Sequence, residues 1–202
     1  MRKVFFILFL ALFAITFFVK AYPSNAQEAV VETETPIGVE EKATESSKTL
    51  PQRVNYELPY PGILPDSPFY FLKVIRDGIV KLLINEDMKM ARFSLENAEK
   101  RMYAGKLLID KSKDELALST ISKSNNYLDD AMRAVMDAKK KNSKNPDIRS
   151  FLLQTRTAIA KHIEIIMDQR IEIDSKYSAY LTSEEKRLKN TQKTVESLLR
   201  TK

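Results

Sequence analysis

The sequence contains no cysteine and no tryptophan, and only one histidine and four glycines among 202 residues. The lack of cysteine excludes thiol catalysis, zinc–thiolate sites and iron–sulfur clusters. With glycine only at positions 38, 62, 78 and 105, no glycine-rich loop is available to hold a phosphate group. These absences remove most common classes of catalytic and cofactor site.

The remaining candidates for chemistry are one imidazole and a few carboxylate pairs. On a helix His162 has only alanine and isoleucine neighbours, so we expect a polar residue at the edge of a helix seam and not a metal ligand. Paired acids occur at Glu96 and Glu99, Asp129 and Asp130, and Glu184 and Glu185. Such pairs are ordinary on a solvated helix face, and no sequence feature marks a pocket around them. We therefore predict no catalytic, cofactor-binding or metal site, and no enzyme.

The N-terminus has the order of a secretory signal peptide. Arg2 and Lys3 precede an uncharged run from Val4 to Val19, and small residues at Ser24 and Ala26 suit cleavage after residue 26. The alternative for residues 1–26 is an uncleaved membrane anchor. The apolar run of 16 residues is slightly long for a signal peptide and slightly short for a membrane span, which takes about 20 residues. Either outcome places residues 27–202 outside the cytoplasm, as a secreted, periplasmic or membrane-anchored protein. The absence of disulfides is compatible with export, because a chain of about 150 residues can bury about 70% of its surface without them.

Residues 27–55 are rich in glutamate, threonine and serine and have no aromatic side chain. This composition predicts a disordered acidic tether. Residues 56–202 are then the folded domain. The whole chain has a net charge of +6, but acids and bases alternate along the domain, which indicates a mixed charged surface and no nucleic-acid partner.

A proline-rich entry at 56–68 leads into the most apolar helix of the domain. Prolines in the entry disfavour helix, and Ser67 and Pro68 are predicted as the N-cap and first residue of a helix. That helix has one narrow polar stripe, which is typical of a buried central helix. We expect a clamp packed on the domain, in which Tyr60, Ile63, Leu64, Phe69 and Leu72 are mostly buried. The candidate clamp or interaction residues are Tyr56, Tyr60, Ile63, Leu64, Pro65, Phe69 and Tyr70. Exposure of the expected buried side chains would favour recruitment of a partner instead.

Downstream, apolar residues recur at alternating steps of three and four, which predicts helices. The fold class is all-α, an elongated bundle or array of about five helices at 68–84, 86–111, 113–141, 146–174 and 183–200. Ser112 to Glu115 and Thr182 to Glu185 are predicted capping boxes, and Asn145 and Pro146 a third helix start. The alternative is an extended coiled coil that buries its seams only as a homo-oligomer.

The entry also carries a resemblance to a family. The residues Leu58, Pro59, Pro61 to Pro65 and Ser67 to Lys73, followed by a charged helix with Lys100 and Arg101, resemble the opening of an uncharacterised family known as domain of unknown function 5667. The resemblance extends from Leu58 to about Arg101. It implies a small exported helical domain and carries no assigned activity.

Two functions fit these features. The first is a non-enzymatic structural or protein-interaction module of the cell envelope, bound to an unknown envelope protein. The alternative is a periplasmic-type chaperone or envelope-stress sensor, because Leu181 to Glu185 is similar to the Leu-Thr-x-x-Gln element of such proteins. Its client surface would use Met88, Met90, Met102, Met132, Met136 and Met167. We prefer ordinary core filling as the role of these methionines. Buried methionines would support core filling, and methionines exposed on one surface would support the chaperone.

Overall fold

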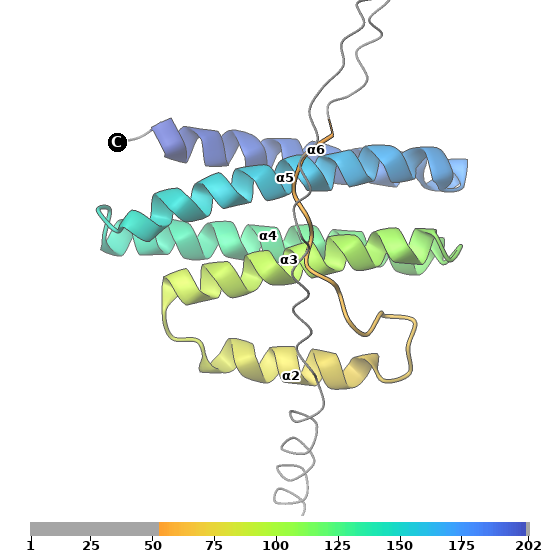
Figure 1. The fold of residues 1–202 in the computed structure, drawn as a ribbon, viewed down its shortest axis with the longest axis horizontal. Coiled ribbons are helices and arrows are strands. Elements are labelled where there is room, and N and C mark those ends of the chain that lie inside the picture. Colours follow the sequence, from red (N-terminus) through yellow and green to blue (C-terminus); the bar gives the residue numbers. More distant parts are fainter. Residues whose placement is uncertain (1–52, 201–202) are drawn as a thin grey trace, which may run out of the picture. The chain divides into compact units, whose positions relative to one another are not determined.

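The computed structural model describes residues 53–200, and within this range the chain forms five helices and no strand (Figure 1). The helices are α2 (Tyr70–Leu83), α3 (Asp87–Ile109), α4 (Asp114–Lys141), α5 (Pro146–Glu172) and α6 (Ser175–Arg200). The predicted all-α class is confirmed. The predicted signal peptide and nearly all of the predicted tether lie outside the described residues. Among the helices that are described, none is long and apolar enough to cross a bilayer.

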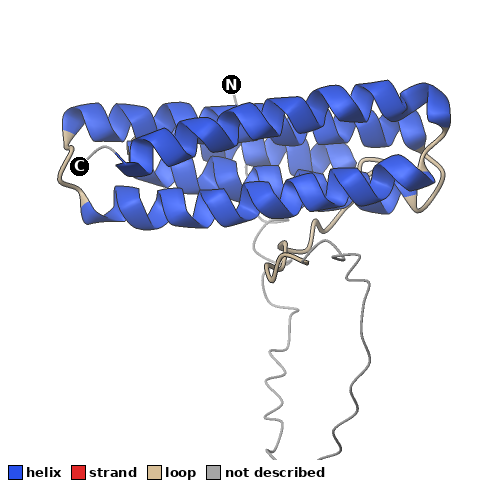
Figure 2. Ribbon diagram, turned by 90° about the horizontal axis from the view of Figure 1, so that it is seen from above, coloured by secondary structure: helices blue, strands red, loops and turns tan. Residues whose placement is uncertain are grey.

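Helices α3 to α6 form a four-helix bundle (Figures 1 and 2). Helix α3 packs against α4 and α5 against α6, and the two pairs meet where α3 contacts α5 and α4 contacts α6. The predicted seams of α3 and α4 are buried in this bundle: Met88, Ala91, Leu95, Ala98, Met102, Gly105 and Ile109 from α3, and Ala117, Ile121, Ser124, Leu128, Ala131, Val135 and Ala138 from α4. One chain therefore buries its own seams, and the coiled coil that needs oligomerisation to do so is wrong.

The small residues of these seams set the distance between α3 and α4. A Cβ atom at Gly105 would lie 2.4 Å from Cγ1 of Ile121, which is closer than real contacts allow. Only glycine fits here without displacement of a neighbour. Helices α3 and α4 therefore approach each other closely at this point.

Within the four-helix bundle, local capping chemistry was predicted correctly at one helix start and wrongly at two. Asn145 caps α5, since its side chain accepts a 3.0 Å hydrogen bond from the amide of Asp147. Ser112 does not cap α4, because it has a φ of 55° and Lys113 is the N-cap residue. Thr182 lies inside α6, where its hydroxyl donates to the carbonyl of Ser178. Helix α6 begins eight residues earlier than predicted, where the Asp174 carboxylate accepts from the amide of Lys176.

The burial of His162 and of the methionines differs from residue to residue. His162 is fully buried in α5, so the predicted edge position is wrong. Among residues 53–200 neither ring nitrogen has a hydrogen-bond partner, and burial lowers the pKa of His162 to about 3. Three of the six methionines, Met88, Met102 and Met132, belong to the buried core, whereas Met136 and Met167 are partly exposed. For those three, the predicted core-filling role is confirmed.

Candidate functional site: the entry segment and helix α2

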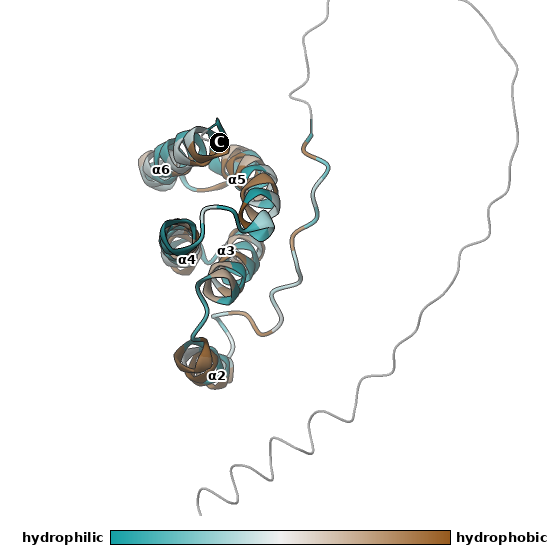
Figure 3. Ribbon diagram, turned by 90° about the vertical axis from the view of Figure 1, so that its left-hand side faces the viewer, coloured by the Kyte–Doolittle hydropathy of each residue, from teal (hydrophilic) through white to brown (hydrophobic). Residues whose placement is uncertain are grey.

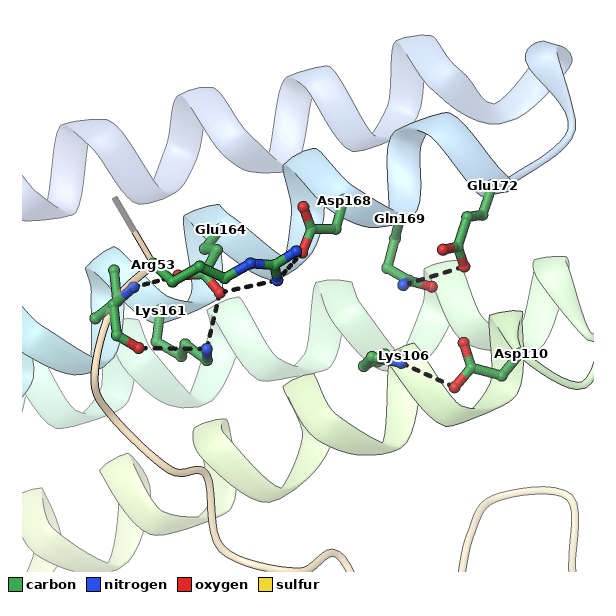
Figure 4. A network of polar contacts seen from close by, with 9 residues as sticks. Arg53, Lys106, Asp110, Lys161, Glu164, Asp168, Gln169 and Glu172 are labelled. Carbon is green, nitrogen blue, oxygen red and sulfur yellow. Dashed lines mark hydrogen bonds and ion pairs between the residues drawn. The ribbon is translucent and has the colours of Figure 1, made fainter. Parts of the chain in front are cut away.

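The chain enters the domain as an extended segment, residues 53–69, which we call the entry segment. Its first residues are bonded to α5 (Figure 4). Arg53 Nη1 lies 2.9 Å from Oδ2 of Asp168, and the amide of Val54 donates to Oε2 of Glu164 over 2.6 Å. Burial opposes ionisation of Glu164, but bonds from Lys161 and the Val54 amide hold its pKa below the usual value. Arg53 and Val54, assigned from sequence to the tether, are thus attached to the bundle.

The next contact of the entry segment is with α3. Tyr56 is half-buried and donates a hydrogen bond from its hydroxyl to Oε1 of Glu99. Burial and the neighbouring carboxylate raise the pKa of Tyr56 to about 12, and burial also raises the pKa of Glu99. Leu58 packs against the core beside Tyr56. This part of the entry segment behaves as a clamp.

From Tyr60 onward the expected burial is wrong. Tyr60 is 73% exposed, Ile63 45%, Phe69 62% and Leu72 52%, while Leu64 is half-buried. The physical reason is that polar groups hold this stretch to its surroundings. The Pro61 carbonyl accepts from Lys73 Nζ at 2.5 Å, and the half-buried Asp66 carboxylate pairs with Lys111 and Lys113 at 3.2 and 3.0 Å.

Residues 64–69 form turns, and α2 begins at Tyr70, two residues later than predicted. The Ser67 hydroxyl accepts from the amide of Phe69 at 3.3 Å, so Ser67 organises a turn and is not the N-cap. Pro65 is half-buried in this turn and Pro68 is exposed. Residues 62–69 of the entry segment therefore lead to α2 at the edge of the bundle, and none of their apolar side chains is fully buried.

Helix α2 is attached to the bundle by its polar side. Arg101 of α3 is buried and donates from Nη1 to the Tyr70 hydroxyl at 2.5 Å. Its Nη2 donates to the Tyr127 hydroxyl of α4 at 3.2 Å, and its guanidinium carbon lies 4.6 Å from the centroid of the Tyr127 ring. One arginine thus joins three helices through charge-assisted bonds and a cation–π contact.

Further polar residues continue this attachment along α2. Lys73 reaches the entry segment at Pro61, and Lys81 pairs with Asp130 of α4 at 2.9 Å. Asp77 is buried and pairs with Arg76 at 2.7 Å. Tyr70, Lys73, Asp77 and Lys81 are spaced by three and four residues, so they share the face of α2 that is turned to α3 and α4.

The opposite side of α2 is apolar and exposed. Helix α2 itself lies at the edge of the bundle, apart from α5 and α6 (Figure 3). We call its apolar side the outward face, and it consists of Phe71, Leu72, Ile75, Ile79, Leu82 and Leu83. The exposed fractions of these residues run from 52% to 84%. At 3.6 residues per turn they cover about 120° of the helix circumference. The prediction of a buried central helix is wrong, because α2 turns its polar stripe inward and its apolar side to the surface.

An open groove of about 460 Å³ lies between the entry segment and α3, and it includes the carboxylate pair of Glu96 and Glu99. Both carboxylates have partners within the chain. Glu99 accepts from Tyr56, and Glu96 pairs with Lys100 at 2.5 Å. Among the described residues, no group of three or more His, Cys, Asp or Glu side chains is placed to hold a metal ion.

The fold and this surface define a class: an all-α domain in which a four-helix bundle carries an extra apolar helix on its edge. The chain matches the family model described as Domain of unknown function (DUF5667) over residues 62–198, and it belongs to that family. The match takes in all five helices almost completely, and so extends far beyond Arg101, where the sequence resemblance ended. No curated protein and no solved structure matches the chain.

Proposed function

We propose that this protein is a non-enzymatic, exported module of the cell envelope that docks onto another protein surface through the outward face of α2. One observation carries the proposal. Six large apolar side chains of one helix are more than half exposed, while the polar residues of the same helix are bonded to the bundle. With full exposure at roughly 200 Å² for each such side chain, these exposed fractions give the outward face about 750 Å² of apolar surface. That exceeds the few hundred Å² usual for a monomer.

The composition of the outward face supports a protein partner. It has aromatic and aliphatic side chains and no charged residue, which is the composition of the centre of a protein interface. Phe69, also exposed, lies directly before the N-terminal end of α2 and extends the apolar surface. Export rests on the N-terminal sequence, in which a basic pair precedes an apolar run and small residues.

The residues that suggested a chaperone or an enzyme make contacts within the domain. Leu181 belongs to the core, and Glu185 pairs with Arg170 at 2.9 Å, so the chaperone-like element serves packing in α6. Met132 is buried, and the methionines do not gather on one open surface. In the groove, Glu96 and Glu99 bond to neighbouring side chains. These contacts support an interaction module over a chaperone or an enzyme.

Site-specific photocrosslinking in cells that export the full chain tests the proposal. A photoreactive residue replaces Ile79 on the outward face in one variant and Ile171, which is 85% exposed on α5, in the control. We expect discrete crosslinked products from position 79 and none from position 171. Diffuse labelling from both positions, or no product from position 79, would contradict the proposal. Fractionation of the same cells tests export. Recovery of the protein in the cytoplasmic fraction would contradict it.

A further inference from the structure

We infer that the partner of the outward face is a second copy of this chain, and that two α2 helices pair face to face in a symmetric dimer. The inference rests on the proposed docking role of α2 and names its partner. Leu72, Ile75, Ile79 and Leu82 follow one another at steps of three, four and three. This is the spacing of a seam between two paired helices, and Phe71 and Leu83 widen it.

The exposed area suits a dimer of this kind. About 750 Å² from each copy gives about 1,500 Å² on pairing, which lies within the range of about 1,200–2,000 Å² buried by stable protein interfaces. A symmetric dimer needs one self-complementary patch, and an uncharged row of leucine and isoleucine side chains can pack against its own copy without like-charge repulsion. A Cβ atom at Gly78, beside the seam, would meet no atom within 4 Å, so there is room for a second helix to approach.

The charges of α2 favour a second copy over a lipid surface. A helix that lies on an anionic bilayer presents lysine and arginine to the headgroups along the margins of its apolar side. In α2, Lys73 and Lys81 instead point to the bundle, where they bond to the Pro61 carbonyl and to Asp130. Arg76 is at the margin of the outward face but pairs with the buried Asp77. The outward face therefore has the apolar character of an interfacial helix, but its margin carries only Arg76, whose charge is paired with Asp77, in place of a row of lysine and arginine.

The mass of the full chain in solution tests the dimer. We compare the protein, as purified after export, with the double variant Ile75→Glu/Ile79→Glu and with the control Ile171→Glu, by light scattering over a range of micromolar concentrations. We expect twice the protomer mass for the protein and the control, and the protomer mass for the double variant. All three proteins should keep the same helix content, because these isoleucines are exposed and lie outside the core.

A cysteine crosslink gives a second readout, since the chain has no cysteine of its own. Ile79→Cys should form a covalent dimer with a short bifunctional thiol reagent, and Ile171→Cys should not. Protomer mass for the unaltered protein together with no crosslink at position 79 would overturn the inference.

Two further measurements separate failure of the dimer from failure of the docking role. If the protein is a monomer and position 79 photocrosslinks to a different envelope protein, the dimer is wrong and the docking role stands. If the monomer instead floats with phosphatidylglycerol vesicles and the double variant does not, the outward face binds lipid, and both proposals are wrong. A monomer with neither property also overturns both.

Discussion

The guanidinium of Arg101 donates a 2.5 Å hydrogen bond to the hydroxyl of Tyr70, and this contact fixes which side of α2 meets the bundle. Arg101 is buried, so its charge has to be satisfied by groups that reach it. Tyr70 and Tyr127 do so from α2 and α4. The outward direction of the apolar side of α2 follows from this pairing, because opposite sides of one helix cannot both face the bundle.

Removal of the arginine should release α2 from the bundle. We expect Arg101→Met to lower the free energy of unfolding by about 1.5–3 kcal/mol, the usual contribution of hydrogen bonds to a charged group. Amide hydrogen exchange should accelerate in residues 70–83 more than in α5. Arg156→Met is the control, since Arg156 is an exposed residue of α5. Unchanged exchange in α2 of the Arg101 variant would contradict this role.

The two helical glycines should respond in opposite directions to alanine. Gly105→Ala places a Cβ 2.4 Å from Ile121, so we expect a loss of about 1–3 kcal/mol through overpacking between α3 and α4. Gly78→Ala meets open space in the middle of α2, so its effect should be a gain of about 0.5–1 kcal/mol from helix propensity. Chemical denaturation measures both. Equal effects of the two changes would show that the close approach at Gly105 is not rigid.

The buried imidazole predicts a dependence of stability on pH. His162 has a pKa of about 3 in the folded chain and an ordinary value of 6.5, so between these values the unfolded chain binds a proton that the folded chain excludes. The contribution of His162 to stability is therefore complete above pH 6.5 and is lost as the pH falls toward 3, by at most about 1.4 kcal/mol per pH unit.

His162→Leu removes this loss. We expect the leucine variant to lose less stability than the parent protein between about pH 7 and about pH 5, measured by urea denaturation. Carboxylates titrate in both proteins, so only the difference between their slopes reports on His162. Identical slopes would mean that a protonated imidazole is tolerated in the core.

The hydroxyl of Tyr56 should control the ionisation of Glu99. In Tyr56→Phe the carboxylate loses the hydrogen bond that opposes the effect of burial, so the pKa of Glu99 should rise further. Stability should fall by about 1–3 kcal/mol at neutral pH, because a buried acceptor is left without its donor. Carboxyl-carbon NMR titration measures the pKa. Tyr60→Phe, at an exposed position of the entry segment, should change neither quantity.

The helices of the bundle were largely predictable, and the start of α6 was not. Seams such as the one from Met88 to Ile109 repeat at steps of three and four over several turns, and only one side of a helix can bury such a row. Thr182 to Glu185 has the residue types of a capping box, but the same residue types also occur inside helices, so they do not by themselves mark a helix start. The carboxylate of Asp174 bonds to the amide of Lys176 and begins α6 earlier.

In the candidate site, too, the helix was predictable from the sequence and its packing was not. The sequence by itself determined that the segment after Pro68 is a helix with one polar stripe, because the polar residues at 73, 76, 77 and 81 are spaced by three and four and apolar residues cover most of the rest. A hydrophobic pattern predicts that a helix face is covered, but it does not identify the residues or the molecule that cover it. Only the tertiary structure, in which α3 and α4 bring Arg101 and Tyr127 together, decided that the bundle receives the polar face of α2 and leaves the apolar face exposed.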